Sequence, residues 1–413
     1  MSGFSGHLPG SREYRRLLAG LFFAGIATFA QLYSPQAVLP MIAADLGVAP
    51  ATAALSVSAC TLGLAAAVIP WSMVADRVGR VPAMAIGILA ATVLGVAAPF
   101  AGDIGLFLVV RLLEGAALGA VPAVALAYLS EEVDAGHAAA AAGSYVAGTT
   151  VGGLAGRLVS GPVADLVEWR AGLWAVAGLC AASAVLFLWL VPRARGFVLH
   201  RHLPERGPRI AARLAVNLRS PVQLVLYAQA FLLMGGFVGI YNYLGFHLTA
   251  PPFALPAWIV TLLFLAYLAG TLTSPWAGSL AARHGRLPVL LASVGCSILG
   301  LVLMFVPVVP ALLVGLVVFT AGFFGAHAIA SGWAPTAARP DTRAQASSLY
   351  YLAYYGGSSV FGWALGWLFA DVGWEVFVAA IIAMCAVAGA LAALALRRPA
   401  PTPAPVPGAS PTG

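Results

Sequence analysis

Charged residues are scarce in this chain, and their scarcity excludes several classes of protein. Only 8% of the 413 residues are Asp, Glu, Lys or Arg, against roughly a quarter in an ordinary soluble domain. A water-soluble fold needs more charge than this to cover its surface. We therefore exclude a soluble enzyme, a disordered chain and a nucleic-acid-binding protein, and we expect no nucleic-acid partner.

Cysteine is rare, lysine is absent, and several chemical motifs are missing. The four cysteines lie far apart in apolar segments without a CxxC pair, so they predict neither disulfides nor a metal site. No G-x-x-x-x-G-K-S/T phosphate loop occurs, which argues against ATP-driven transport by this chain alone. No aspartate-rich motif or Ser/His/Asp set lies at membrane depth. The sequence thus predicts no catalytic residue, metal or cofactor.

Long apolar runs are what the chain has in abundance, since 61% of its residues are hydrophobic. A helix needs about 20 apolar residues to cross the hydrocarbon layer. Apolar windows and helix breakers together predict an all-α integral membrane protein with twelve spans. The predicted spans are 17–38, 52–72, 82–101, 105–129, 138–163, 171–192, 221–247, 257–277, 288–307, 311–333, 346–369 and 375–396.

The arginines predict the orientation of these spans. With both termini in the cytoplasm, 18 of the 21 arginines fall on cytoplasmic segments and only Arg170 lies outside. Arg111 and Arg157 lie within spans. This asymmetry follows the positive-inside rule, and it makes anionic lipid headgroups of the bilayer the expected partner of the net charge of +7.

The longest hydrophilic stretch divides the predicted spans into two halves. We predict a six-helix bundle over residues 1–192, a basic cytoplasmic linker over 193–220, and a second six-helix bundle over 221–396. Residues 397–413 are rich in Pro, Ala and Thr, and such a composition predicts a disordered tail.

The two halves repeat each other at nearly one offset. Asp76-Arg77-Val78-Gly79-Arg80 is echoed 206 residues later by Ala282-Arg283-His284-Gly285-Arg286. The segment 145–151 in the fifth span is echoed 209 residues later by the segment 354–360 in the eleventh. Asp165 and Trp169 are echoed by Asp371 and Trp374. Similar half-bundles around a central site are typical of alternating-access carriers.

Arg111 and Glu114 are charged residues inside the fourth span. They lie three residues apart, so they share one face of a helix. Charged groups within a span are costly and usually face the bundle interior or water. We interpret them as a pair that lines the cavity and handles protons, with Glu114 as the group that titrates. The alternative is a structural ion pair that fixes helix packing.

Two further motifs lie at a turn and on a helix face. Asp76, before Arg77, Gly79 and Arg80, is expected to cap a neighbouring helix in one conformation of the carrier, as a latch; a solvated turn is the alternative. Glycines 148, 152, 153 and 156 on the fifth span permit close approach or bending, with plain packing as the alternative. The neighbouring Arg157 has two interpretations, snorkelling to the outer surface or contact with the substrate.

Polar and aromatic residues within the spans are candidates for a substrate cavity. They are Gln31, Tyr33, Tyr241, Asn242, His327 and Tyr354. His327 and His247 can also titrate near neutrality, although a single buried histidine is more often a packing residue. Some tyrosines near span ends are expected to be interfacial anchors instead.

At these residues the chain resembles the major facilitator superfamily, over about Leu17 to Leu396. The loop at residues 72–81 is similar to the signature G-x-L-A-D-R-x-G-R-R/K, with Ser72 and Val81 as departures. The segment 111–115 is similar to R-x-x-Q-G, with Glu114 in place of glutamine. The segment 148–153 partly matches the antiporter signature G-P-x-x-G-G, but it lacks the proline. Within the superfamily, the drug:proton antiporter branch is the most similar.

The resemblance implies a secondary transporter of the bacterial cytoplasmic (inner) membrane, not an enzyme. We expect proton-coupled efflux of a small solute or drug by alternating access, with protons and a small-molecule substrate as partners and a monomer as the working unit. Uptake of a sugar or organic acid by symport or facilitated diffusion is the first alternative. A membrane-embedded prenyl or acyl transferase is the second. The substrate itself is not predicted, because one fold serves many solutes.

Overall fold

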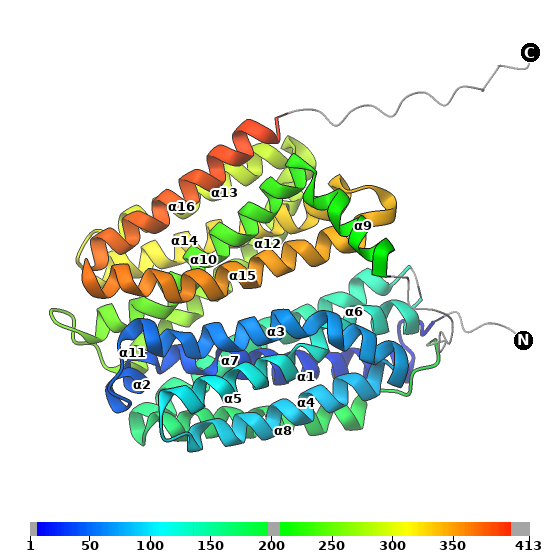
Figure 1. The fold of residues 1–413 in the computed structure, drawn as a ribbon, viewed down its shortest axis with the longest axis horizontal. Helices are drawn as coiled ribbons and strands as arrows, with labels where there is room; N and C mark the ends of the chain where they lie inside the picture. Colours follow the sequence, from blue (N-terminus) through cyan, green and yellow to red (C-terminus); the bar gives the residue numbers. More distant parts are fainter. Residues whose placement is uncertain (1–5, 135, 197–206, 398–413) are drawn as a thin grey trace, which may run out of the picture.

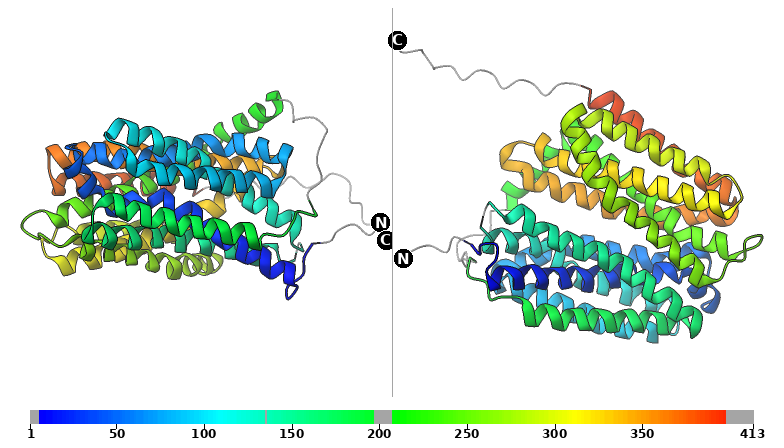
Figure 2. Two further views of the ribbon diagram at one scale, coloured as in Figure 1. Left: turned by 90° about the horizontal axis from the view of Figure 1, so that it is seen from below. Right: turned by 180° about the vertical axis from the view of Figure 1, so that it is seen from behind.

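The computed structural model describes residues 6–134, 136–196 and 207–397, and it is almost entirely helical there. The helices form two groups that lie side by side with their long axes roughly aligned (Figure 1), and the same division is visible from behind (Figure 2). The predicted tail lies outside the described residues except for Arg397, and so does the linker segment 197–206.

The first group contains helices α1 to α8, and the second contains α10 to α16. Helix α9 precedes the second group. The first eight helices are α1 (Arg12–Tyr33), α2 (Leu39–Asp45), α3 (Pro50–Val78), α4 (Arg80–Ala97), α5 (Ile104–Leu118), α6 (Ala120–Glu132), α7 (Ala138–Leu166) and α8 (Trp169–Leu190). The others are α9 (Gly207–Leu218), α10 (Pro221–Thr249), α11 (Ala257–Thr261), α12 (Tyr267–His284), α13 (Arg286–Leu303), α14 (Val309–Ala337), α15 (Arg343–Asp371) and α16 (Trp374–Ala395). Short 3-10 turns are η1 (Ser34–Ala37), η2 (Ala98–Phe100), η3 (Leu262–Ala266) and η4 (Pro340–Thr342).

Within the described residues, ten helical segments are long and apolar enough to cross a membrane. They correspond to ten of the twelve predicted spans. The remaining two predicted spans are helices α7 and α15, which have 29 residues each but carry many Gly, Ser, Thr and Tyr residues. The small and hydroxylated residues lower the apolarity of these two helices, although their length matches that of α3, α10 and α14. Crossing by all twelve remains a prediction.

Several helices differ in detail from the predicted spans, although the fourth and eighth each correspond to one candidate span, Ile104–Glu132 and Ala257–His284. Helix α3 continues to Val78, so Asp76 lies in its last turn and not in the following loop. The fourth predicted span is divided at Gly119 into α5 and α6. The eighth is divided by η3 and then continues to His284. Inside the predicted linker, residues 207–218 form α9, whose Asn217 donates a hydrogen bond to the carbonyl oxygen of Thr342 at 3.2 Å.

The internal repeat extends to the packing of individual atoms. A Cβ atom on Gly148 of α7 would lie 2.2 Å from the carbonyl oxygen of Phe22 in α1. A Cβ atom on Gly357 of α15 would lie 2.1 Å from the carbonyl oxygen of Phe231 in α10. Both members of the second pair follow those of the first by 209 residues (357 − 148 and 231 − 22). The two groups therefore use the same close helix contact, which argues against chance similarity of apolar sequences.

The end of the first group that contains α2 is held by one carboxylate. Asp45 accepts hydrogen bonds from the Trp169 indole nitrogen at 3.0 Å and from the Arg170 guanidinium at 2.7 Å. The Trp169 hydrogen bond contributes most to lowering the pKa of Asp45 below its ordinary 3.8, and Arg170 contributes next. A pKa that is lower in the folded chain means that the contact stabilises the fold above pH ~3.8. That stabilisation is lost as the pH falls through the folded value.

Asp45→Asn is therefore expected to lower the Tm of the purified protein slightly at pH 7. The decrease should be a few degrees at most, because the side chain of Asp45 is 45% exposed and exposed ion pairs contribute about 1 kcal/mol or less. The difference in Tm between variant and parent should shrink as the pH falls below about 4. Thermal unfolding in detergent across this pH range tests the expectation, and a difference that does not change with pH contradicts it.

Candidate functional site

Arg111 and Glu114 of α5 form a buried ion pair. Arg111 is 2% exposed and Glu114 is 0% exposed, and the Arg111 Nη1 atom donates to Glu114 Oε2 at 2.5 Å. The remaining hydrogen bonds of Arg111 go to backbone carbonyl oxygens, those of Gln31 at 3.2 Å, Leu32 at 2.7 Å and Ser56 at 3.1 Å. Two of these carbonyls lie at the C-terminal end of α1, where a helix dipole favours a cation. The pair thus fastens α5 to α1 and α3.

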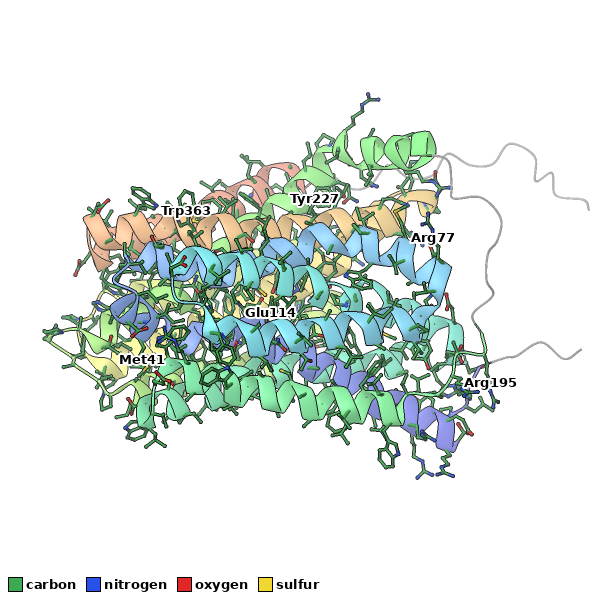
Figure 3. The ribbon with its side chains drawn as sticks, turned by 60° about the horizontal axis from the view of Figure 1, so that its bottom comes forward. Met41, Arg77, Glu114, Arg195, Tyr227 and Trp363 are labelled. Atoms are coloured by element: carbon green, nitrogen blue, oxygen red, sulfur yellow. The ribbon has the colours of Figure 1, made fainter. Side chains whose placement is uncertain are left out.

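A small cavity with room for about one water molecule adjoins this pair. Gln31, Ser34 and Gly95 line it together with Arg111 and Glu114. The Glu114 Oε1 atom is buried and has no hydrogen-bond partner among the described residues. Every residue that lines the cavity belongs to the first group of helices, and Glu114 lies about midway along the molecule between the ends marked by Arg77 and Met41 (Figure 3).

Arg157 of α7 lies in a different place, between the two groups of helices. Its guanidinium carbon lies 4.4 Å from the centre of the Tyr33 ring, 5.0 Å from that of Phe264 and 4.6 Å from that of Tyr267. Tyr33 belongs to the first group, and the other two rings belong to the second. We call Arg157 and these three rings the Arg157 cage. Arginine over aromatic faces is a favourable cation–π arrangement.

Hydrogen bonds connect the Arg157 cage to both groups. Arg157 donates to the Gln36 side-chain oxygen at 2.8 Å, to the Gly153 carbonyl oxygen at 2.5 Å and to the Tyr267 hydroxyl at 3.1 Å. Gln36 in turn donates from Nε2 to the Asn242 side-chain oxygen at 2.7 Å. The chain of contacts therefore runs from α7 through η1 to α10, so any motion between the two groups at this point must change it.

A second small cavity lies directly beside the cage. Gln36, Tyr241 and Phe264 are among the residues that line it, and both groups of helices contribute. Tyr241 lies 4.6 Å from Tyr267 between ring centres, and its hydroxyl is 2.8 Å from the hydroxyl of Thr320. Of the predicted cavity residues, Tyr33, Tyr241 and Asn242 thus gather around Arg157.

The contacts described for the other predicted cavity residues are made outside the Arg157 cage. Gln31 donates to the carbonyl oxygen of Ala91 at 2.5 Å and faces the Glu114 cavity. His327 is 3.0 Å from the Tyr350 hydroxyl through Nδ1, and its ring centre is 4.8 Å from that of Tyr354. His247 stacks on Trp374 with ring centres 4.2 Å apart. His327 and Tyr354 therefore form a polar aromatic cluster on α14 and α15, separate from the ion pair.

The turn predicted to act as a latch contains a connected set of charges. The Asp76 carboxylate, whose side chain is 59% exposed, accepts from Arg80 at 2.6 Å. Arg80 also pairs with Glu131 of α6 at 2.7 Å. Gly79 has a φ of +100°, and Gly285 in the second group has +88°, a conformation that favours glycine at both turns. Arg77 is exposed.

The glycines of α7 fall on two different faces. Gly148, Gly152 and Gly156 each pack against the backbone of α1, with Cβ positions 2.2 to 2.7 Å from its atoms. Gly153 instead faces Arg157 Nη1 at 3.4 Å and Tyr33 at 4.0 Å. Close packing explains the first three, whereas Gly153 leaves room for the guanidinium of Arg157.

Sequence reasoning missed part of this arrangement. It left Arg157 undecided between the outer surface and the substrate, but the side chain is 1% exposed, so the snorkelling interpretation was wrong. It did not single out Gln36, Phe264 or Tyr267. A polar Gln36 near the end of the first predicted span and a hydroxyl-bearing Tyr267 in the eighth were the available signals, but the residues that meet across the two groups are more than 100 positions apart.

A sequence profile described as Major Facilitator Superfamily matches residues 21–257 and 249–412. The inner membrane transport protein YnfM of Escherichia coli (strain K12) is 37% identical over 390 residues, which cover 94% of this chain and 92% of that relative. The uncharacterized MFS-type transporter YybF of Bacillus subtilis (strain 168) is 32% identical over 379 residues, or 92% of this chain and 93% of YybF. The resemblance inferred from the sequence motifs is confirmed, and so is the inner-membrane location.

A shorter match and two solved structures complete the comparison. The puromycin resistance protein pur8 of Streptomyces alboniger is 32% identical over 161 residues, 38% of this chain and 31% of that protein. The nucleoside transporter NupG has a TM-score of 0.75 at 16% identity, over 91% of this chain and 99% of its own. A bacterial homolog of the human lysosomal transporter Spinster has a TM-score of 0.76 at 16% identity, over 95% and 100%. These structures show a shared fold.

Proposed function

This chain belongs to the major facilitator superfamily, whose members are transporters and not enzymes, and on that basis we propose that it exports a small solute in exchange for protons. It works by alternating access with twelve spans, with both termini in the cytoplasm. The buried pair of Glu114 and Arg111 carries the proposal, because one oxygen of this carboxylate has no hydrogen-bond partner in the described part of the chain and lies beside a cavity of water-like size. The partial match to a puromycin resistance protein supports export over import.

The proton step follows from the contacts of Arg111. When Glu114 is charged, it neutralises the guanidinium, which also binds the carbonyls of α1 and α3. A proton that reaches the free Oε1 atom through the small cavity removes this neutralisation. Arg111 stays charged at any relevant pH, so its remaining bonds to α1 and α3 must readjust. Protonation at Glu114 is thereby linked to the packing of α1, the helix that leads to Tyr33 and the Arg157 cage.

The direct test uses purified protein in vesicles that contain a pH-sensitive dye. An imposed proton gradient should drive accumulation of an exported solute from a panel of drugs and organic acids, and the dye should record the counterflow of protons. Solute movement in the same direction as protons, or movement that a gradient does not accelerate, contradicts export by exchange. The first of these outcomes is the one expected for symport.

Substitution of Asp76 in the charged turn is expected to change the rate of transport by a smaller amount than substitution of Glu114. Asp76→Asn is expected to slow turnover by up to about fivefold, because an exposed pair such as Asp76–Arg80 is worth at most about 1 kcal/mol. Substrate affinity should be unchanged, since Asp76 lies in the last turn of α3, whereas Tyr33 of the cage lies at the end of α1 that leads into the start of α3. Ala282→Asn is the matched control, because Ala282 occupies the equivalent position in the second group. Equal turnover of Asp76→Asn and parent contradicts the latch.

A further inference from the structure

Arg157 is a buried cation whose three observed hydrogen-bond partners are all uncharged. Among the described residues no carboxylate pairs with it, and its three hydrogen bonds go to an amide oxygen, a carbonyl oxygen and a hydroxyl. Arg111 shows the contrast, since it is equally buried but is paired with Glu114. An uncompensated charge inside a membrane protein is costly, and such residues usually mark a pathway or a binding site.

The guanidinium of Arg157 still has donors to offer. Arginine carries five N–H groups, and the hydrogen bonds to Gln36, Gly153 and Tyr267 use one each on Nε, Nη1 and Nη2. One N–H on each Nη atom is left without a hydrogen bond in the described part of the chain. Two donors on adjacent nitrogens suit the two oxygens of a carboxylate, which arginine commonly binds through a pair of parallel hydrogen bonds.

The residues around Arg157 restrict the chemical character of the part of the ligand that the guanidinium does not bind. Tyr33, Phe264 and Tyr267 surround the guanidinium with rings. The adjoining cavity is lined mostly by apolar residues, together with Gln36 and Tyr241. Such walls suit an apolar or aromatic body. Because Arg157 supplies one positive charge and no second cation joins it in the cage, a single carboxylate matches the site better than a doubly charged phosphate.

From these contacts we propose that the transported solutes are organic anions with one carboxylate on an apolar or aromatic body, and that Arg157 binds the carboxylate. The solute would take the position of a counterion between the two groups of helices, in contact with residues of both. This proposal rests on the chain being a carrier, but it does not depend on proton coupling, because binding to Arg157 requires no gradient.

Equilibrium binding to the purified protein in detergent tests the proposal. The probes are aromatic monocarboxylates from benzoate to naphthoate, each compared with its uncharged carboxamide, and the readouts are the shift in Tm and calorimetric Kd. We expect at least one acid to bind about tenfold or more tightly than its amide. Arg157→Gln should abolish that preference, whereas Arg157→Lys should keep part of it, because lysine retains the charge but not the paired donors.

Arg170→Gln is the matched control, since it removes an arginine that lies outside the cage, and it should leave the preference unchanged. The comparison of acid with amide in the parent needs no variant, so the test survives if Arg157→Gln does not fold. Equal binding of acids and amides, absence of binding by every acid, survival of the preference in Arg157→Gln, or equally tight binding of inorganic phosphate would each overturn the proposal. Preferential acid binding with no proton-driven transport would instead contradict only the proton coupling.

Discussion

Glu114→Gln is expected to abolish proton-driven accumulation of the solute, while exchange of solute across the membrane without a gradient persists. Glutamine has nearly the same shape as glutamate and can still accept from Arg111, but it cannot take up a proton. Glutamine is also the residue that the family signature R-x-x-Q-G carries here. The measurement is solute uptake into vesicles across about pH 5.5 to 8, the range over which a perturbed carboxylate titrates, with counterflow as the second assay.

Two controls separate coupling from structure in this experiment. Glu375→Gln makes the same chemical change at an exposed carboxylate in the first turn of α16 and should transport like the parent. Removing one partner of a buried ion pair commonly costs about 3–5 kcal/mol, so Glu114→Gln also has to be tested for folding. The double variant Arg111→Gln with Glu114→Gln leaves no unpaired buried charge and should also lack coupling, although it loses the hydrogen bonds of Arg111 to three backbone carbonyls. Proton-driven transport by either variant at the parent's rate would make the pair structural.

The order of helices could be predicted from the sequence, because long apolar runs record where the chain crosses the bilayer. The internal repeat could also be recognised in the sequence, from the turns at Gly79 and Gly285 and from the similarity of segment 145–151 to segment 354–360. The break between α5 and α6 at Gly119 and the presence of helix α9 could not be predicted in the same way. Apolarity alone does not locate a break in helical hydrogen bonding. Apolar windows also located α7 and α15, although the glycines and hydroxyls of these helices make them less apolar than the ten candidate membrane spans.

The candidate site was only partly predictable, for a different physical reason. Arg111 and Glu114 are one helical turn apart, so their pairing follows from sequence spacing. The partners of Arg157 come from segments near residues 33–36 and 264–267, and their meeting depends on how the two groups of helices dock. Sequence position places Arg157 near one end of a span, but only the rotation of α7 shows that it faces the other group and not lipid or water.

Gly156→Ala is expected to disturb the normal packing of α7 on α1 and to lower Tm by about one to four degrees. A Cβ atom at this position would lie 2.2 Å from the carbonyl oxygen of Ala30, where ordinary contact begins at 3.4 Å. The helices would have to separate by roughly 1 Å, and overpacking of this kind commonly costs about 1–3 kcal/mol. Because Gly148 and Gly152 make similar contacts with the same helix, a shift at one position loosens the others.

The predicted change in stability at Gly156 is opposite in sign to the change expected at a glycine without close neighbours. Alanine is intrinsically a better helix former than glycine by about 0.5–1 kcal/mol, so a glycine without a close neighbour should be stabilised or unaffected. Gly143 in the same helix has no atom within 4 Å of its Cβ position, and Gly143→Ala is therefore the matched control. Thermal unfolding and gel filtration of both variants give the comparison. If Gly156→Ala is as stable as Gly143→Ala, the glycines of α7 do not set the distance between α1 and α7, and their spacing must be explained by motion between these helices instead.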